Sequence, residues 1–164
     1  MGWPVVFSQV RIGQNGKEFR LHKFRSMKKV KSNTTVAAQE QNRITSFGKF
    51  MRKYKLDELP ELWNIIRGDM SFVGPRPDVP GYADVLEGDD RVILQLKPGL
   101  TGAASLKYIH EEELISQQEN PQEYNDKVIW PDKIRINKLY YENWSFFTDI
   151  KVLIYTVLQK QFDD

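Results

Sequence analysis

The chain has 164 residues, 40% hydrophobic and 28% charged, which is enough for one domain with a packed core and excludes global disorder. It contains no cysteine, which excludes disulfides and thiolate metal sites, and no apolar run reaches the roughly 18 residues that a membrane-spanning helix needs. The formal net charge is only +2, yet residues 1–60 carry 13 Lys and Arg against four Asp and Glu. This basic part indicates either an anionic partner or a solvated basic surface.

The first predicted element is a β-hairpin over residues 5–25. Two stretches of strand-like composition flank the segment "GQNGK", whose Asn-Gly pair is typical of a hairpin turn. Residues 28–42 are polar without periodicity, which predicts a loop. A helix is predicted to start at Thr45 or Ser46, because either side chain can cap it. Its helical spacing predicts a buried face of Phe47, Phe50, Met51 and Tyr54.

A second helix is predicted to begin close to Asp57, since Pro60 is tolerated only in the first turn of a helix, and to end at Gly68. Residues 69–102 are rich in Gly and Pro, which favours shaped loops, with a short helix between residues 82 and 96. The apolar stripe of the second helix is predicted to contain Leu59, Leu62, Trp63 and Ile66.

Residues 111–142 predict two further helices, with Pro121 and Pro131 near their starts, and a last helix begins at Ser145. No repeat and no internal domain boundary is visible. The predicted fold class is therefore α+β: a mainly helical single domain over residues 1–164 with a small N-terminal β-hairpin. The apolar face of the last helix is predicted to contain Phe146, Ile150, Leu153, Ile154 and Val157.

Two adjacent acids, Asp57 and Glu58, stand at the predicted start of the second helix. Helix capping is the simpler explanation, because Asp is a preferred N-cap residue. The positive end of a helix also keeps a carboxylate ionised, and an ionised aspartate can attack phosphorus while a neighbouring acid binds Mg²⁺. The spacing alone leaves both interpretations open.

Four basic or hydroxyl residues are candidates for phosphate binding: Arg52, Arg76 in "GPRP", and Lys97 and Thr101 in "KPGLTG". Arginine pairs bidentately with phosphate oxygens, although each arginine could equally be a surface residue. The segment "KPGLTG" does not have the residue order of a Walker A loop. His22 and His110 are isolated and show no zinc-binding spacing.

Three segments occur in the order typical of bacterial sugar transferases: "KFRSM" (23–27), "FGKFMRKYKLDELPELWNIIRGDMSFVGPRP" (47–77) and "LKPGLTG" (96–102). From Pro4 to about Leu158 the chain resembles the monotopic polyprenyl-phosphate phosphoglycosyl transferases. This resemblance implies transfer of a phospho-sugar from a UDP-sugar to undecaprenyl phosphate, with release of UMP. It also implies a place at the cytoplasmic face of the bacterial inner membrane, where such transfer initiates the assembly of exopolysaccharide, capsule, O-antigen or glycoprotein glycans.

The resemblance carries residue roles as well. It implies that Asp57 is the catalytic nucleophile, forming a covalent aspartyl phospho-sugar intermediate, and that Asp57 and Glu58 bind the cofactor Mg²⁺, with Mn²⁺ as an alternative. Arg52 and Arg76 match arginines near the substrate phosphates. Further residues in matching stretches are Lys97, Thr101 and Asp149.

The family also carries an apolar re-entrant membrane helix before the hairpin. This chain starts where that helix should end, so a truncation before residue 1 is expected, and the chain would then behave as a soluble or peripheral domain.

Two other functions fit parts of the sequence. A Mg²⁺-dependent nucleotide-sugar hydrolase would use the same acids with water as the acceptor. A nucleic-acid or anionic-lipid binding module would explain the basic residues 1–60 but not the acid pair or "GPRP". The expected partners are therefore a UDP-sugar, undecaprenyl phosphate and the membrane surface, with no nucleic acid.

Overall fold

The computed structural model describes residues 5–27 and 44–161, and the loop predicted over residues 28–42 lies outside these ranges. Strands β1 (Val6–Ile12) and β2 (Glu18–Phe24) form the predicted antiparallel hairpin, with Val6 opposite Phe24 and Ile12 opposite Glu18. In the turn between them Asn15 and Gly16 have φ angles of 59° and 74°. The Asn-Gly turn is confirmed, because these two residue types tolerate positive φ best.

Helix α2 (Ser46–Lys53) begins as predicted. The hydroxyl of its N-cap Thr45 accepts a hydrogen bond from the backbone N–H of Gly48 at 2.9 Å and donates one to the carbonyl of Ser26 at 3.3 Å. This cap therefore stabilises the first turn of α2 and ties it to the end of the hairpin.

The predicted start of the second helix is wrong. Asp57 lies in a separate 3₁₀ turn, η2 (Leu56–Glu58), and helix α3 (Glu61–Arg67) starts after Pro60. Proline has no N–H to donate back into the preceding turn, so η2 and α3 do not merge into one helix. The predicted end is confirmed: Gly68 follows α3 with φ 83°.

The Gly- and Pro-rich segment holds two short parallel strands that were not predicted, β3 (Ser71–Val73) and β4 (Gly99–Thr101). A Cβ atom on Gly99 would lie 2.2 Å from the backbone nitrogen of Gly74, so only glycine allows the two backbones to approach this closely. Between the strands, the predicted short helix is instead a pair of 3₁₀ helices, η3 (Ala83–Val85) and η4 (Gly88–Gln95).

The helices that begin near Pro121, Pro131 and Ser145 follow the prediction, but residues 111–142 hold three α-helices where two were predicted. Pro121 and Pro131 lie in the first turns of α6 and α7, and the Ser145 hydroxyl caps α8 by accepting from the Thr148 N–H at 3.1 Å. The elements are α4 (Ala103–Lys107), which was not predicted, α5 (Glu111–Ser116), α6 (Pro121–Tyr124), the π-helical turn η5 (Asn125–Ile129), α7 (Trp130–Glu142) and α8 (Phe146–Val157).

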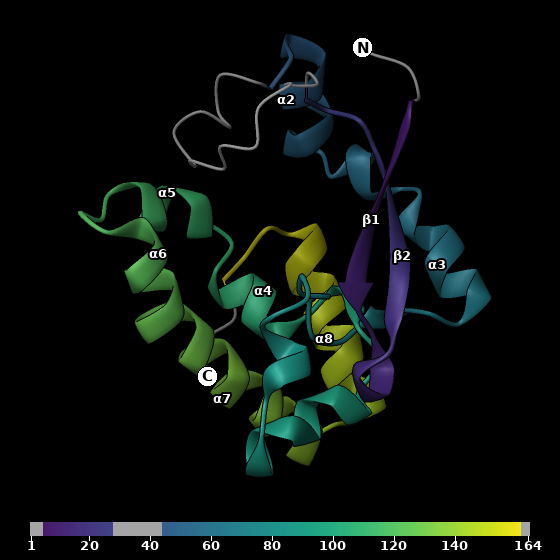
Figure 1. Ribbon diagram of the computed structural model, residues 1–164. Coiled ribbons are helices and arrows are strands. Elements are labelled where there is room, and N and C mark those ends of the chain that lie inside the picture. Colours follow the sequence, from purple (N-terminus) through teal and green to yellow (C-terminus); the bar gives the residue numbers. More distant parts are fainter. Residues whose placement is uncertain (1–4, 28–43, 162–164) are drawn as a thin grey trace.

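The main core lies where β3, α4, α7 and α8 meet (Figure 1), with Val152 of α8 fully buried. Helices α5 to α7 lie on one side of the hairpin and α3 on the other, as Figure 1 shows. The predicted α+β class, mainly helical with an N-terminal hairpin, is confirmed. The buried members of the main cluster are Val73, Leu106, Tyr140 and Val152.

The predicted buried faces of α2, α3 and α8 are largely wrong. Of the four residues of the predicted face of α2, only Met51 is buried. Periodicity identifies side chains that share one face of a helix, but not whether another element covers that face. In the described residues no helix is both long and apolar enough to cross a bilayer. The predicted core residues that are exposed are Phe47, Phe50, Tyr54, Leu59, Leu62, Trp63, Ile66, Phe146, Ile150, Ile154 and Val157.

Candidate active site

A cavity of about 850 Å³ opens between the hairpin, α2, the η2 turn and the start of α5. It brings together four residues singled out from the sequence: Arg52, Asp57, Glu58 and Arg76. Its charged lining residues are the cations Arg11, Lys23, Arg25, Arg52, Lys55 and Arg76 and the acids Asp57, Glu58, Glu112 and Glu113.

Asp57 is buried, with 8% of its surface exposed, although it lines the cavity. Across residues 5–27 and 44–161 its carboxylate makes no hydrogen bond or ion pair. Lys55, which precedes the η2 turn, has a φ of 56°, an unfavourable backbone conformation for a residue with a side chain. Strain of this kind is concentrated at functional sites, where it helps to fix a reactive group.

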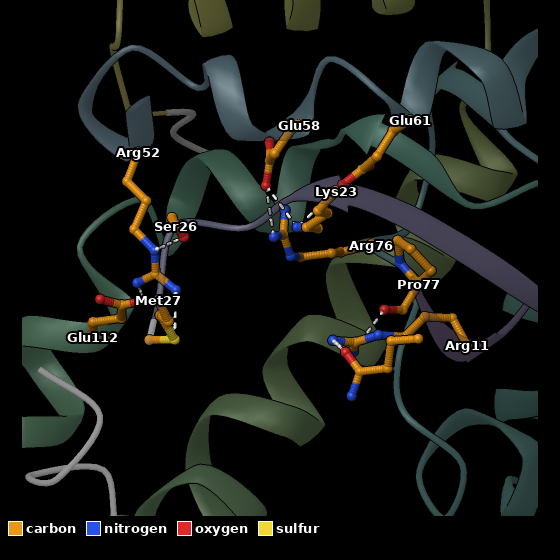
Figure 2. A network of polar contacts seen from close by, with 11 residues as sticks. Arg11, Lys23, Ser26, Met27, Arg52, Glu58, Glu61, Arg76, Pro77 and Glu112 are labelled. Atoms are coloured by element: carbon orange, nitrogen blue, oxygen red, sulfur yellow. Dashed lines mark hydrogen bonds and ion pairs between the residues drawn. The ribbon is translucent and has the colours of Figure 1, made fainter. Parts of the chain in front are cut away.

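Glu58 receives two cations on one oxygen. Arg76 Nη2 lies 2.9 Å and Lys23 Nζ 3.0 Å from Glu58 Oε1, as Figure 2 shows. Burial alone would raise the pKa of Glu58, but the positive charges of Arg76 and Lys23 outweigh it and lower the pKa to about 2. Glu58 is therefore ionised at neutral pH, and its other oxygen has no partner in the described part of the chain.

Lys23 also lies 3.1 Å from Glu61 Oε1, so one ammonium group links two carboxylates. Glu61 is 2% exposed, and burial raises its pKa. Sequence reasoning assigned no role to Lys23 or Glu61. "KFRSM" was noted as a segment, but nothing local indicates that its lysine reaches an acid 35 residues later.

Arg52 of α2 lines the cavity and contacts two other segments of its wall. Its Nε donates to the hydroxyl of Ser26 at 3.3 Å, and its Nη1 lies 3.6 Å from Glu112 Oε1 (Figure 2). About a third of the Arg52 side chain is exposed, so the guanidinium keeps access to a bound molecule. This arginine thereby links α2 to the end of the hairpin and to α5.

Three predicted site residues do not line the cavity, and their roles stay predictions: Lys97 and Thr101 as phosphate-binding residues and Asp149 as a possible site residue. The Thr101 hydroxyl pairs with that of Thr156 at 2.7 Å. Asp149 accepts hydrogen bonds from Tyr140 at 2.5 Å and from Trp144 at 3.3 Å. Lys97 lies just before β4 and outside the cavity wall. The two glycines of "KPGLTG" allow the backbone of Gly74 to pack closely against this segment.

The acids present suit a magnesium ion that is completed by its substrate. Across the residues that the structure describes, no group of three acidic, histidine or cysteine side chains could hold a metal ion alone. Mg²⁺ is usually bound through one or two carboxylates together with substrate phosphates. The carboxylate of Asp57 and the unpaired oxygen of Glu58 provide such a donor set.

A buried pair of acids beside several cations defines a site for a highly anionic substrate, as in enzymes of phosphoryl transfer. The chain belongs to the bacterial sugar transferase family, whose model matches residues 1–162.

Three relatives illustrate the similarity. The sugar transferase EpsL of Bacillus subtilis (strain 168) is 35% identical, and the match covers 96% of this chain and 70% of EpsL. The UDP-glucose:undecaprenyl-phosphate glucose-1-phosphate transferase of Klebsiella pneumoniae is 34% identical over 95% of this chain and 32% of its own length. The undecaprenyl-phosphate galactose phosphotransferase of Salmonella typhimurium is 33% identical, and the match covers 94% of this chain and 33% of that protein. The chain thus spans about a third of the last two.

Proposed function

We propose that this chain is the catalytic domain that transfers a phospho-sugar from a UDP-sugar to undecaprenyl phosphate, releasing UMP. Relatives whose names state this type of reaction match at least 94% of the chain. The observation that carries the proposal is Asp57: a buried carboxylate without a partner among the described residues, in a cavity wall that also contains Lys23, Arg52 and Arg76.

The proposed chemistry has two displacements at one phosphorus atom. A carboxylate oxygen of Asp57 attacks the β-phosphorus, and the bond from that phosphorus to the bridging oxygen breaks, so that UMP leaves with the electron pair. An oxygen of undecaprenyl phosphate then attacks the same phosphorus, and the bond to Asp57 breaks. The products are undecaprenyl-diphosphate sugar and a regenerated carboxylate. A covalent intermediate of this kind divides one difficult step into two easier ones.

The main obstacle to this reaction is the repulsion between an anionic nucleophile and an anionic diphosphate. The cations of the cavity reduce this repulsion. Arg52, Arg76 and Lys23 supply positive charge around Asp57 in a partly buried setting, where such charge acts strongly. When bound, Mg²⁺ would add Lewis-acid neutralisation of the diphosphate, held by Asp57 and Glu58. The salt bridges from Arg76 and Lys23 hold Glu58 in place for this purpose.

The acceptor is a lipid, which agrees with exposed apolar side chains on α2 and α3, since α2 and the η2 turn that follows it also contribute residues to the cavity wall. This α2–α3 apolar surface consists of aromatic and aliphatic side chains on consecutive elements, and basic residues such as Lys49 and Lys53 accompany it in α2. Aromatic and basic side chains together favour binding to anionic membranes. Its members are Phe47, Phe50, Tyr54, Leu59, Leu62, Trp63 and Ile66.

The reaction is tested by UMP release. The protein is incubated with undecaprenyl phosphate, Mg²⁺ and a panel of UDP-sugars, and we expect UMP with at least one donor, together with the diphosphate-linked sugar. UMP with free sugar phosphate in the absence of lipid would instead support the hydrolase. Tight, salt-sensitive DNA binding without any turnover would favour the binding module.

The covalent step is tested with Asp57→Asn. We expect UMP release to fall by at least about 10³-fold, because the amide is a very poor nucleophile. A radiolabelled UDP-sugar added without lipid acceptor should leave label bound to the wild-type protein and none to the variant. Asp89→Asn, an exposed aspartate outside the cavity, serves as the control and should retain both activities. Near-normal turnover in Asp57→Asn would eliminate the covalent role.

A further inference from the structure

Arg11 is a cation of the cavity wall that the ion pairs around Glu58 do not include. It lies on β1, two residues after Gln9, and alternate residues of a strand face the same side. Phe7, Gln9 and Arg11 accordingly all line the cavity. Sequence analysis assigned no role to any of the three.

The contacts of Arg11 leave part of its guanidinium unused. Nη1 donates to the carbonyl of Pro77 at 3.2 Å and Nη2 to the side-chain oxygen of Gln9 at 2.9 Å, while the buried Nε has no acceptor (Figure 2). A guanidinium has five N–H donors. Two neutral acceptors therefore fix the position of the guanidinium but leave its Nε–H without a hydrogen-bond acceptor.

The charge of Arg11 is also uncompensated at short range. Over residues 5–27 and 44–161 Arg11 forms no ion pair, whereas Lys23 and Arg76 both bind Glu58. Burial and the charge of Arg76 lower the pKa of Arg11, and the charges of Asp78 and Glu61 act in the opposite direction. Two arginines in one wall repel each other, and an anion between them would relieve this repulsion.

We propose that Arg11 binds a substrate phosphate together with Arg76, and that Gln9 is the positioning residue that holds its guanidinium. Arginine forks match the geometry of phosphate oxygens, and a guanidinium already fixed by Gln9 and Pro77 loses little entropy on binding. The inference rests on the proposed function, which supplies two sources of phosphate: the diphosphate of the sugar donor and the phosphate of the lipid acceptor.

The test compares Arg11→Gln with Arg20→Gln, which removes the same charge from an exposed position on β2 outside the cavity. Calorimetry measures the affinity for UDP and for uridine, and steady-state kinetics gives KM for donor and acceptor. A lost charge-assisted hydrogen bond should weaken UDP binding by about 10- to 100-fold and leave uridine binding unchanged. Arg11→Lys should recover part of the loss, and Arg20→Gln should match the wild type.

The outcomes separate the two sources. Weaker UDP binding with a raised donor KM assigns Arg11 to the diphosphate, and a raised acceptor KM alone assigns it to the lipid phosphate. Unchanged affinity and unchanged KM values in Arg11→Gln overturn the proposal while UMP release by the wild type leaves the proposed function standing. Equal weakening of UDP and uridine, with a lowered Tm, also overturns it, because a purely structural residue would act that way. If the wild type releases no UMP, weaker UDP binding by Arg11→Gln with unchanged uridine binding still supports the proposal, and unchanged UDP binding overturns it.

Discussion

At the scale of single residues, the site depends on a balance between burial and charge. Burial opposes the ionised form of Glu58, and Arg76 and Lys23 more than compensate for it. Glu61 lacks this excess of cations, so burial prevails and its pKa rises. The pKa values of Glu58 and Glu61 therefore shift in opposite directions, because the two carboxylates have different numbers of cations close to them.

This balance makes stability depend on pH. The pKa of Glu58 falls from 4.5 to about 2 on folding, so its contribution is fully present above pH 4.5 and is lost as the pH falls towards 2. Glu61, with a raised pKa, contributes in the opposite direction. We expect the drop in unfolding free energy between pH 6 and pH 3 to be smaller in Glu58→Gln by about 1–3 kcal/mol. Denaturant titrations at both pH values measure it.

The control for this experiment is Glu119→Gln, an exposed glutamate outside the network, which should follow the wild-type pH dependence. The same drop in Glu58→Gln as in the wild type would show that the ion pairs to Glu58 do not govern acid stability.

Arg76 is predicted to matter for catalysis as well as for the position of Glu58. About 45% of its side chain is exposed while it holds Glu58 at 2.9 Å, so it can contact a phosphate at the same time. We expect Arg76→Ala to lower kcat/KM for the UDP-sugar by about 10- to 100-fold. Arg67→Ala, at the end of α3 and outside the cavity, should leave kcat/KM unchanged. An unaltered kcat/KM in Arg76→Ala would remove this arginine from the site.

At the scale of elements, the parallel pair β3–β4 positions Arg76. The segment "GPRP" follows β3 directly, and the N–H of Gly74 donates to the carbonyl of Thr101 at 2.9 Å. Since Gly74 and Gly99 touch backbone to backbone, the glycines of "GPRP" and "KPGLTG" are required by the same contact. This packing contact therefore explains the spacing of the glycines.

Gly99→Ala should destabilise the protein by about 3 kcal/mol or more, because the new Cβ collides with the backbone of Gly74. Gly81→Ala is the matched control: its Cβ would meet nothing within 4 Å, and only its φ of 100° is unfavourable, at about 1–2 kcal/mol. Thermal and denaturant unfolding measure both changes. A smaller loss for Gly99→Ala than for Gly81→Ala would contradict the packing explanation.

At the scale of the whole molecule, we expect the α2–α3 apolar surface and the charge distribution to act together in membrane binding. All of the excess positive charge lies in residues 1–60, because the rest of the chain has more Asp and Glu than Lys and Arg. Residues 1–60 include the hairpin, α2 and much of the cavity wall. An anionic membrane attracts such a surface electrostatically, and exposed aromatic side chains add apolar burial. The cavity would then face a lipid-borne acceptor.

Membrane binding is predicted to depend on the aromatic side chains of α2. Phe47 and Phe50 are more than half exposed, with ring centroids 6.3 Å apart. Replacing both with serine should reduce partitioning onto phosphatidylglycerol-containing vesicles by about tenfold or more, because two apolar side chains no longer leave water on binding. Co-sedimentation measures the effect, with Phe147→Ser, an exposed position on α8, as the control. Equal partitioning of the double variant and the wild type would exclude α2 from the contact.

The local features could be predicted from the amino-acid sequence alone: the Asn-Gly hairpin turn, the caps at Thr45 and Ser145, the end of α3 at Gly68, and the acid pair at residues 57–58. Each depends on backbone conformations and hydrogen bonds between near neighbours, which the adjacent residue types specify. The α3 start was wrong only because Pro60 separates two turns instead of opening one helix.

The apolar helix faces that become covered, and the charged side chains that come into contact, depend on tertiary packing and could not be predicted from the sequence. Lys23 and Glu58 are 35 residues apart, and Arg11 and Pro77 are 66 apart, so no local pattern could place them in one cavity. Burial has the same origin: Met51 and Phe50 are adjacent and both apolar, yet only Met51 is covered by other elements. Contacts between distant segments arise from how the elements pack, and sequence periodicity does not contain that information.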